Sequence, residues 1–416
     1  MTNEQPAGEA ALLQEGYRRA AWRLIPFLVF LFILAWIDRV NVGFAKLSML
    51  SDLNFSEAVY GLGAGIFFIG YFLFEVPSNL LLEKIGAKKT LARITILWGI
   101  TSIAMAWVKS ESAFYVLRFL LGAFEAGFFP GVVLYLTYWF PAERRSQING
   151  LFMTSFAIAG VVGGPVAGWV MSAMGGVHGM TNWQWLFILE GIPSILAGFA
   201  VLAFLPDRPN RASWLTPAMA QAMTARLESE AKAQAREHNF TAALTDPKVW
   251  LCTIIYFCIV SGNATIAFWT PSIIKEIGVQ GNFTIGLVSA IPFVAGTIAM
   301  VWNGHHSDKT GEVRLHCAIA SLIAAIGILA AFPVFWAMPQ TFLAGMAAAG
   351  GIAVINSIGN LAGFVAPYTI GLSTQFTGSS TSGLYVVAAF ELLAAILLFS
   401  VDRIAAPAKA ASAAAH

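Results

Sequence analysis

The sequence predicts an all-α integral membrane protein built from two duplicated helical bundles. Of its 416 residues, 58% are hydrophobic and only 11% are charged, long apolar runs recur, and one short charged motif occurs twice. Soluble domains are about 45–50% apolar and about 25% charged. Most of the surface is therefore expected to face lipid, which excludes an ordinary soluble protein.

Eleven runs are long enough to cross the hydrocarbon core, which takes about 20 mostly apolar residues. Six precede a polar stretch at 206–247, and five follow it. The runs are 24–45, 58–81, 89–108, 113–139, 147–173, 183–205, 249–274, 284–304, 315–339, 345–371 and 383–402. The expected organisation is a tail (1–23), a six-helix bundle (24–205), a central loop (206–247), a second bundle (248–402) and a C-terminal tail (403–416).

Basic residues alternate between the turns, and this pattern predicts the orientation. Seventeen of the 24 Lys and Arg lie in the N-terminal tail, the central loop and three turns on the same side. The opposite turns contain only Lys46, Lys109 and Lys275. Positively charged loops stay in the cytoplasm, so we expect the N-terminus and the central loop to be cytoplasmic.

An internal repeat indicates that the two bundles are related. The turn Asn79-x-x-x-Glu83-Lys84-x-Gly86 recurs 225 residues later as Gly304-x-x-x-Asp308-Lys309-x-Gly311. If both halves had the same length, this offset would place the end of the last run about 28 residues later than it occurs. The difference corresponds to roughly one span and its turn. We therefore expect the second bundle to be shortened around 315–345, with eleven spans where a symmetric pair of six would give twelve.

Ionisable groups inside a span cost at least a few kcal/mol and mark functional candidates. Asp38 and Arg39 lie in the first run, and Arg118 and Glu125 lie seven residues apart in the fourth, on nearly one helix face. An arginine grips a carboxylate with two hydrogen bonds, and a desolvated acid beside it can exchange a proton near neutral pH. These four residues predict a proton-coupled anion site; the alternative is a purely structural ion-pair network.

Other candidates are polar or aromatic residues in the apolar runs. Glu75, beside Pro77, is expected to act as a gate or helix-cap partner. Substrate contacts are predicted for Trp36, Tyr71, Asn356, Asn360 and Trp336, although the aromatic residues could equally serve packing.

Enzyme and nucleic-acid signals are missing from the sequence. There is no phosphate-binding Gly-Lys dipeptide, no His-Glu-x-x-His and no Gly-x-Ser-x-Gly. A net charge of +2 without a basic run argues against nucleic acid. His305 and His306 with Asp308 lie in a charged turn, so neither a metal nor a cofactor is expected.

Several segments together resemble a known family, the major facilitator superfamily, whose halves rock around a central site. Within it, the chain resembles the anion:cation symporters, above all bacterial tartrate, phthalate and hydroxyphenylacetate permeases. The segments are 36–45 (WIDRVNVGFA), 74–79 (FEVPSN), 118–131 (RFLLGAFEAGFFPG), 187–193 (FILEGIP) and 355–364 (INSIGNLAGF).

The resemblance implies proton-driven uptake of an organic carboxylate across the bacterial inner membrane, by a protein that is expected to be a monomer. By position, Asp38 and Glu125 would take up protons, Arg39 would hold the substrate carboxylate and Arg118 would tune Glu125, while Tyr71 and Asn360 would contact the substrate. The family has twelve spans, so this chain departs from it in the second bundle. An inactive remnant or receptor, an exporter or antiporter, and a membrane enzyme are the alternatives.

Overall fold

The computed structural model describes residues 5–234, 246–310 and 354–413, together with 316, 319 and 335. Within this part the chain forms helices and no strand, which confirms the all-α prediction. The long helices are α1 (Gln5–Leu53), α2 (Glu57–Ile85), α3 (Ala87–Ala104), α4 (Glu111–Glu125), α5 (Phe128–Thr137), α6 (Ala142–Ala173), α7 (Asn182–Phe204), α8 (Pro217–Gln234), α10 (Pro247–Glu276), α11 (Asn282–Thr310), α15 (Ala362–Thr377) and α16 (Thr381–Ala413).

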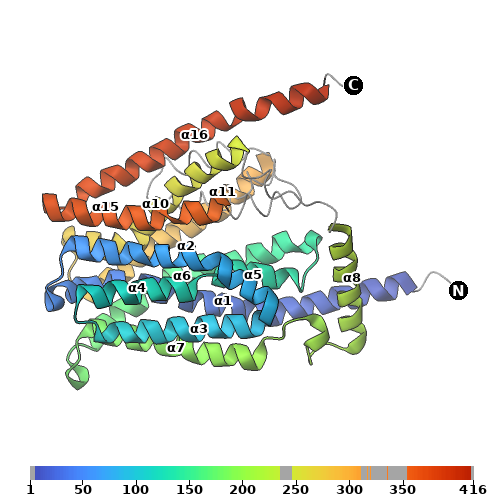
Figure 1. The fold of residues 1–416 in the computed structure, drawn as a ribbon, viewed down its shortest axis with the longest axis horizontal. Helices are drawn as coiled ribbons and strands as arrows, with labels where there is room; N and C mark the ends of the chain where they lie inside the picture. Colours follow the sequence, from blue (N-terminus) through green and yellow to red (C-terminus); the bar gives the residue numbers. More distant parts are fainter. Residues whose placement is uncertain are drawn as a thin grey trace.

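The helices form two groups that lie side by side (Figure 1). Helices α1 to α7 make up the first group, and α10, α11, α15 and α16 make up the second. Nine helices or helix pairs in the described residues are long and apolar enough to cross a membrane. The predicted run 315–339 and the start of the run at 345–371 lie almost wholly outside the described residues.

Two helix pairs make the most extensive contacts between the groups, and α1 also packs against α10. Helix α2 packs along α15, and α6 packs along α11. At the second contact small residues are required: a Cβ on Gly286 would lie 2.4 Å from the carbonyl oxygen of Gly164, and one on Gly168 would lie 2.6 Å from that of Asn282. The glycines at four-residue spacing on α6 therefore allow the backbones to approach closely.

The fourth predicted run is interrupted in the structure. The run 113–139 corresponds to one candidate span, Glu111–Thr137, but within it α4 ends at Glu125 and α5 begins at Phe128. Gly127 between them has φ +84°, a conformation that favours glycine, and Pro130 lies in the first turn of α5. The break leaves Glu125 as the last residue of α4, inside the bundle.

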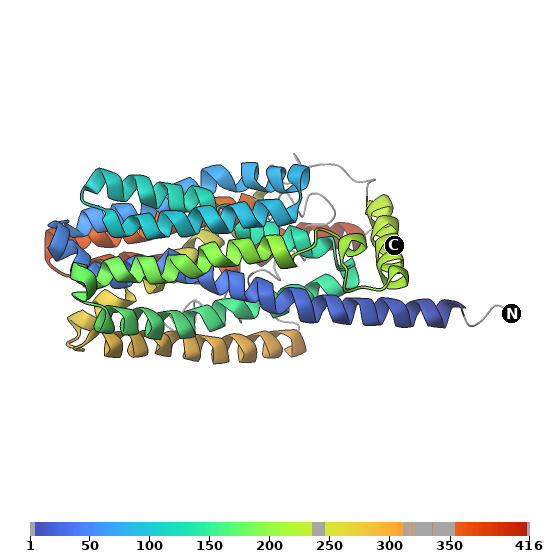
Figure 2. The same ribbon diagram turned by 90° about the horizontal axis from the view of Figure 1, so that it is seen from below.

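The turns richest in Lys and Arg gather at one end of the molecule, called here the basic end. It contains the α2–α3 turn, the start of α6 and α8. Helix α1, with 49 residues, is about 74 Å long and extends past the other helices at this end (Figure 2). Helix α8 lies across the end of the first group (Figure 1).

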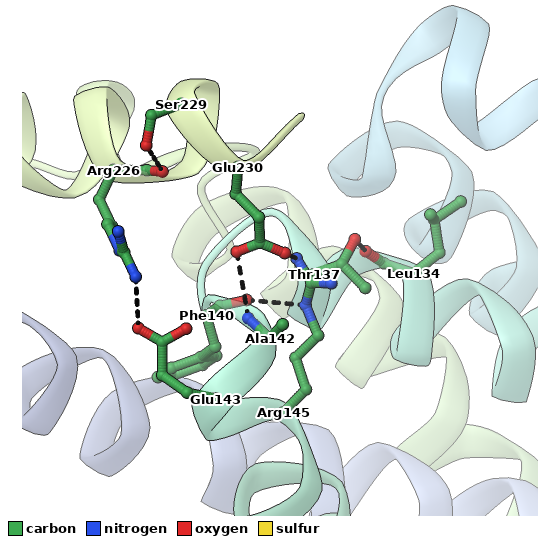
Figure 3. A network of polar contacts seen from close by, with 9 residues as sticks. All are labelled: Leu134, Thr137, Phe140, Ala142, Glu143, Arg145, Arg226, Ser229 and Glu230. Atoms are coloured by element: carbon green, nitrogen blue, oxygen red, sulfur yellow. Dashed lines mark hydrogen bonds and ion pairs between the residues drawn. The ribbon is translucent and has the colours of Figure 1, made fainter. Parts of the chain in front are cut away.

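Ion pairs attach α8 to the start of α6 (Figure 3). Arg226 lies 3.0 Å from Glu143, and Arg145 lies 2.8 Å from Glu230, whose second carboxylate oxygen accepts a hydrogen bond from the backbone N–H of Ala142. Gly16 of α1 packs against Met223 of α8. These contacts fasten α8 to the first group.

Candidate functional site

The centre of the site is an ion pair between α1 and α4. The Arg39 guanidinium donates from Nε to Glu125 Oε1 at 3.0 Å, and its Nη2 contacts the same oxygen. The Glu125 side chain is 1% exposed, whereas that of Arg39 is 18% exposed. The Glu125 carboxylate is thus enclosed, whereas part of the Arg39 side chain is exposed.

Aromatic rings surround the Arg39 guanidinium on three sides. Its central carbon lies 5.8 Å from the ring centre of Trp36, 5.3 Å from that of Phe67 and 5.4 Å from that of Tyr71. Trp36 precedes Arg39 by one turn of α1, and Phe67 and Tyr71 lie one turn apart on α2. Rings at this range stabilise the cation and exclude water. Of the three, Phe67 is the one that the sequence analysis did not single out.

Arg118 lies behind Arg39 and makes no ion pair in the described structure. Its side chain is 0% exposed and donates to the carbonyl oxygens of Gly63 at 3.1 Å, Ala64 at 3.3 Å and Arg39 at 3.4 Å. Such carbonyl bonds satisfy a buried guanidinium. Arg118 therefore holds α1, α2 and α4 together beneath the Arg39–Glu125 pair.

Asp38 points away from Arg39, because adjacent residues of a helix project in different directions. Its carboxylate accepts hydrogen bonds from Trp98 Nε1 at 3.2 Å, from Ser102 Oγ at 2.7 Å and from Ser194 Oγ. These donors belong to α3 and α7 of the first group. The structure thus places the two predicted proton-accepting acids in separate environments, with Glu125 on Arg39 and Asp38 among neutral donors.

Glu75 links the two helix groups. It is buried on α2, and its carboxylate accepts hydrogen bonds from Asn356 Nδ2 at 2.9 Å and Ser357 Oγ at 3.3 Å. Residues 354–360 are helical, and Asn360 lies one turn after Asn356. The second asparagine is half-buried.

The repeated turn is well defined in its first copy. Asn79 donates to the carbonyl oxygen of Glu75 at 3.0 Å, while Glu83 and Lys84 are exposed. Gly86 has φ +93°, and a Cβ there would lie 2.9 Å from Asp207, which accepts the Lys88 N–H at 2.9 Å. In the second copy, Gly304, Asp308 and Lys309 lie in the last turns of α11. Gly311 and Trp336 are outside the described residues.

At the end opposite the basic end, one acid and two aromatic rings surround Lys46, an arrangement that the sequence analysis did not identify. Lys46 Nζ lies 2.7 Å from Glu57 and 3.7 Å from the ring centre of Trp269, and its side chain is 5% exposed. Tyr60 contacts Lys46 as well and donates to the carbonyl oxygen of Phe268 at 2.6 Å. Because Trp269 and Phe268 belong to α10, these contacts close this end between the two groups. The available signal was the seven-residue spacing from Arg39, which puts both cations on one face of α1.

No group of three His, Cys, Asp or Glu that could hold a metal ion occurs in the part of the chain described. In this part of the chain, the partly exposed Arg39 side chain is paired with the enclosed Glu125 carboxylate, and the two groups contact each other at both ends. Such a site can bind an anion and exchange a proton without covalent chemistry.

Comparison with known proteins identifies the family. Residues 28–358 match the family model of the Major Facilitator Superfamily. A putative tartrate transporter of Agrobacterium vitis is 44% identical, covering 93% of this chain and 91% of the relative. The putative metabolite transport protein NicT of Pseudomonas putida is 43% identical, covering 94% of each.

Solved structures agree on the fold. A bacterial homologue of the human lysosomal transporter Spinster, in an inward-facing and occupied conformation, has a TM-score of 0.74 at 14% identity and covers 93% of this chain and 97% of its own. The D-xylose–proton symporter has a TM-score of 0.68 at 15% identity, covering 91% and 97%. The relatives and the fold confirm the family expected from the sequence motifs: the chain belongs to the major facilitator superfamily and is a multi-pass membrane transporter rather than an enzyme.

Proposed function

We propose that this transporter takes up an organic carboxylate together with protons, the substrate being tartrate or a related hydroxy, aromatic or sugar acid. The observation that carries the proposal is the Arg39–Glu125 ion pair, in which a partly exposed arginine side chain is neutralised by an enclosed acid. When Glu125 takes up a proton, the guanidinium loses its partner and becomes free for the substrate carboxylate. Proton and anion then load together.

The remaining candidates have supporting roles in this proposal. Asp38 is a second proton acceptor, coupled to the site through its neighbour Arg39. Trp36 and Tyr71 border the bound anion, with Asn360 and Trp336 contributing from the second group. Asn356 reaches the substrate only after it leaves Glu75, to which it donates a hydrogen bond here.

In the same proposal the basic end is cytoplasmic and the Lys46 end faces outward, in the bacterial inner membrane. This orientation rests on the excess of Lys and Arg at the basic end. The proposed functional unit is a monomer, which suffices because Arg39 and Glu125 belong to the same chain.

Transport by the purified protein tests the function directly. The full chain is reconstituted in liposomes with an internal pH dye, and tartrate, phthalate, 4-hydroxyphenylacetate, galactonate and glucuronate are added in turn. We expect one acid to acidify the lumen faster than in protein-free liposomes, which correct for passive entry of the acid. Alkalinisation would indicate an antiporter or exporter instead, and no response to any acid would indicate an inactive remnant.

Glu75 is proposed to hold the basic end closed through Asn356 and Ser357. Glu75→Ala removes both hydrogen bonds between the groups, so the basic end should open more often. We expect a cysteine at Asn360, in a chain without Cys252, Cys258 and Cys317, to react several-fold faster with a membrane-impermeant maleimide added on the basic side. Glu75→Gln retains one acceptor oxygen and should give an intermediate rate. Equal rates in all three proteins would contradict a gating role.

A further inference from the structure

The interior of the first group contains an acid that the proposed transport cycle does not use. Glu190 lies on α7 and is only 5% exposed. Neither of its carboxylate oxygens makes a hydrogen bond within the described residues. A charged acid in such a place is strongly unfavourable, and acids inside spans often belong to proton relays.

The side chains that face Glu190 belong to α1. They are Asp38 and the amide of Asn41. Asn41 is 1% exposed, and neither of its polar side-chain atoms makes a hydrogen bond within the described residues. One turn further along α7, Ser194 donates to Asp38. The interface between α1 and α7 thus contains two polar levels, Asp38 with Ser194 and Asn41 with Glu190.

The basic residues of α1 have partners elsewhere. Arg39 projects in a different direction from Asp38 and pairs with Glu125. Lys46, nearer the end of α1, pairs with Glu57. Neither of them neutralises the acids at the α1–α7 interface.

The other helices packed against α7 bring no charge to Glu190. These helices are α3, α6 and the short η1 (Met105–Trp107). Helix α3 has no ionisable residue after Arg93, α6 has none after Arg145, and η1 has none. Asp38 is therefore the one ionisable group that faces Glu190 in the part of the chain described.

The two acids differ in the groups around their carboxylates. Asp38 accepts three hydrogen bonds, and one of the donors is the indole N–H of Trp98, which can only donate. These donors stabilise Asp38 as a carboxylate. Glu190 receives none of this support, and a neutral acid is far easier to bury than a charged one.

We propose that Glu190 holds a proton in the core of the first group and transfers it to Asp38 during the transport cycle. The O–H bond of Glu190 breaks and an O–H bond forms on a carboxylate oxygen of Asp38. The negative charge moves to Glu190, where the Asn41 amide can donate to it. This inference rests on the proposed function and adds an acid to its proton pathway.

The position of Glu190 along α7 indicates the direction of the pathway. Glu190 lies four residues, or about 6 Å, before Ser194. The start of α7 is at the Lys46 end, where Ser48 of α1 donates to Asn182 at 2.7 Å. In the orientation proposed above, a proton from outside therefore reaches Glu190 first and then Asp38, along the α1–α7 interface and apart from the Arg39 site.

Infrared spectroscopy of the purified full-length protein tests where the proton lies, because a protonated carboxyl group and a carboxylate absorb in separate bands. At neutral pH, we expect Glu190→Gln to lose a protonated-carboxyl band and Asp38→Asn to lose a carboxylate band. Loss of a carboxylate band in Glu190→Gln would show that Glu190 is charged and would overturn the proposal.

Transport in liposomes with the internal pH dye tests the transfer itself. The added acid is tartrate, or whichever of the other four acids named above acidifies the lumen. We expect Glu190→Gln to slow acidification at least about tenfold, because a positioned acid usually speeds proton transfer by more than this. Exchange of substrate for substrate should continue at its normal rate. Glu190→Asp keeps an acid at this position and should recover most of the acidification.

Glu391 on α16 provides the matched control. It is 3% exposed, and its carboxylate oxygens also make no hydrogen bond within the described residues. It belongs to the second group, whereas Asp38 lies inside the first. Glu391→Gln removes a buried acid of the same kind and should leave the rate of acidification unchanged.

The outcomes separate this inference from the proposed function. Equal loss of acidification and exchange in Glu190→Gln would indicate a structural role alone, and an unchanged rate of acidification would exclude the transfer; either result overturns the inference while carboxylate transport stands. If the unaltered protein acidifies the lumen with none of the five acids, the proposed function and the transfer fail together.

Discussion

Arg39→Lys is expected to lower the affinity for the transported carboxylate by roughly thirtyfold. Lysine keeps the positive charge but loses the planar pair of donors that grips a carboxylate. The loss of one charge-assisted hydrogen bond is worth about 2 kcal/mol, or about a factor of thirty in affinity. The measurement is the KM of counterflow exchange in liposomes.

A matched control is available on α8. Arg226→Lys changes an exposed arginine that pairs with Glu143 at the basic end, far from the aromatic rings around Arg39. We expect its KM to be unchanged. A normal KM in Arg39→Lys would rule out a direct role of the guanidinium in substrate binding.

Glu125→Gln is expected to abolish proton-driven accumulation while exchange of substrate for substrate continues. The amide resembles the protonated acid in shape and charge, so it leaves Arg39 free for the anion but carries no proton across the membrane. The proton carried by Glu125 alone, moved with a monoanion, supports about tenfold accumulation at a pH difference of one unit. In the variant this ratio should fall to about one, with exchange independent of pH.

Glu111→Gln provides the control for the same helix. Glu111 is exposed at the start of α4, fourteen residues before Glu125. This variant should accumulate substrate normally. Retained accumulation in Glu125→Gln would mean that another group, with Asp38 the first candidate, carries the coupled proton.

The expectation that Arg39 and Glu125 belong to one site could be reached from the sequence, because ionisable groups in apolar runs need partners. The partner of Asp38 could not be predicted in the same way. Its donors are Trp98, Ser102 and Ser194, which are ordinary constituents of apolar helices and come from two different spans. Hydroxyl and indole groups are common in apolar helices, so the sequence does not mark them as partners of a buried acid. They reach the carboxylate only because of the way α3 and α7 face α1 in the folded protein.

Arg118 shows a second limit of what the sequence alone can predict about the site. Its spacing from Glu125 places both on nearly one face of α4, which favours a shared role. In the structure Arg118 donates its hydrogen bonds to carbonyl oxygens of α1 and α2 rather than to the Glu125 carboxylate. Backbone acceptors exist at every residue, so a sequence pattern does not reveal that they will be chosen over a carboxylate.

The fourth span is found over Glu111–Thr137, but the break within it was not predicted from the sequence. The apolar run 113–139 continues across Gly127, although the backbone turns there and the helix ends at Glu125. Hydropathy measures how apolar a run of side chains is, so it does not reveal a change in the direction of the backbone. The glycine and the following proline were visible, but neither alone distinguishes a break from a tolerated kink.

Helix α1 passes without interruption from the α8 contact at Gly16, through Arg39, to Lys46. A rotation of this one rod that accompanies anion capture would be transmitted to both surfaces of the membrane at once. Helix α8 at the basic end would then move in response to an anion bound some 35 Å away at Arg39.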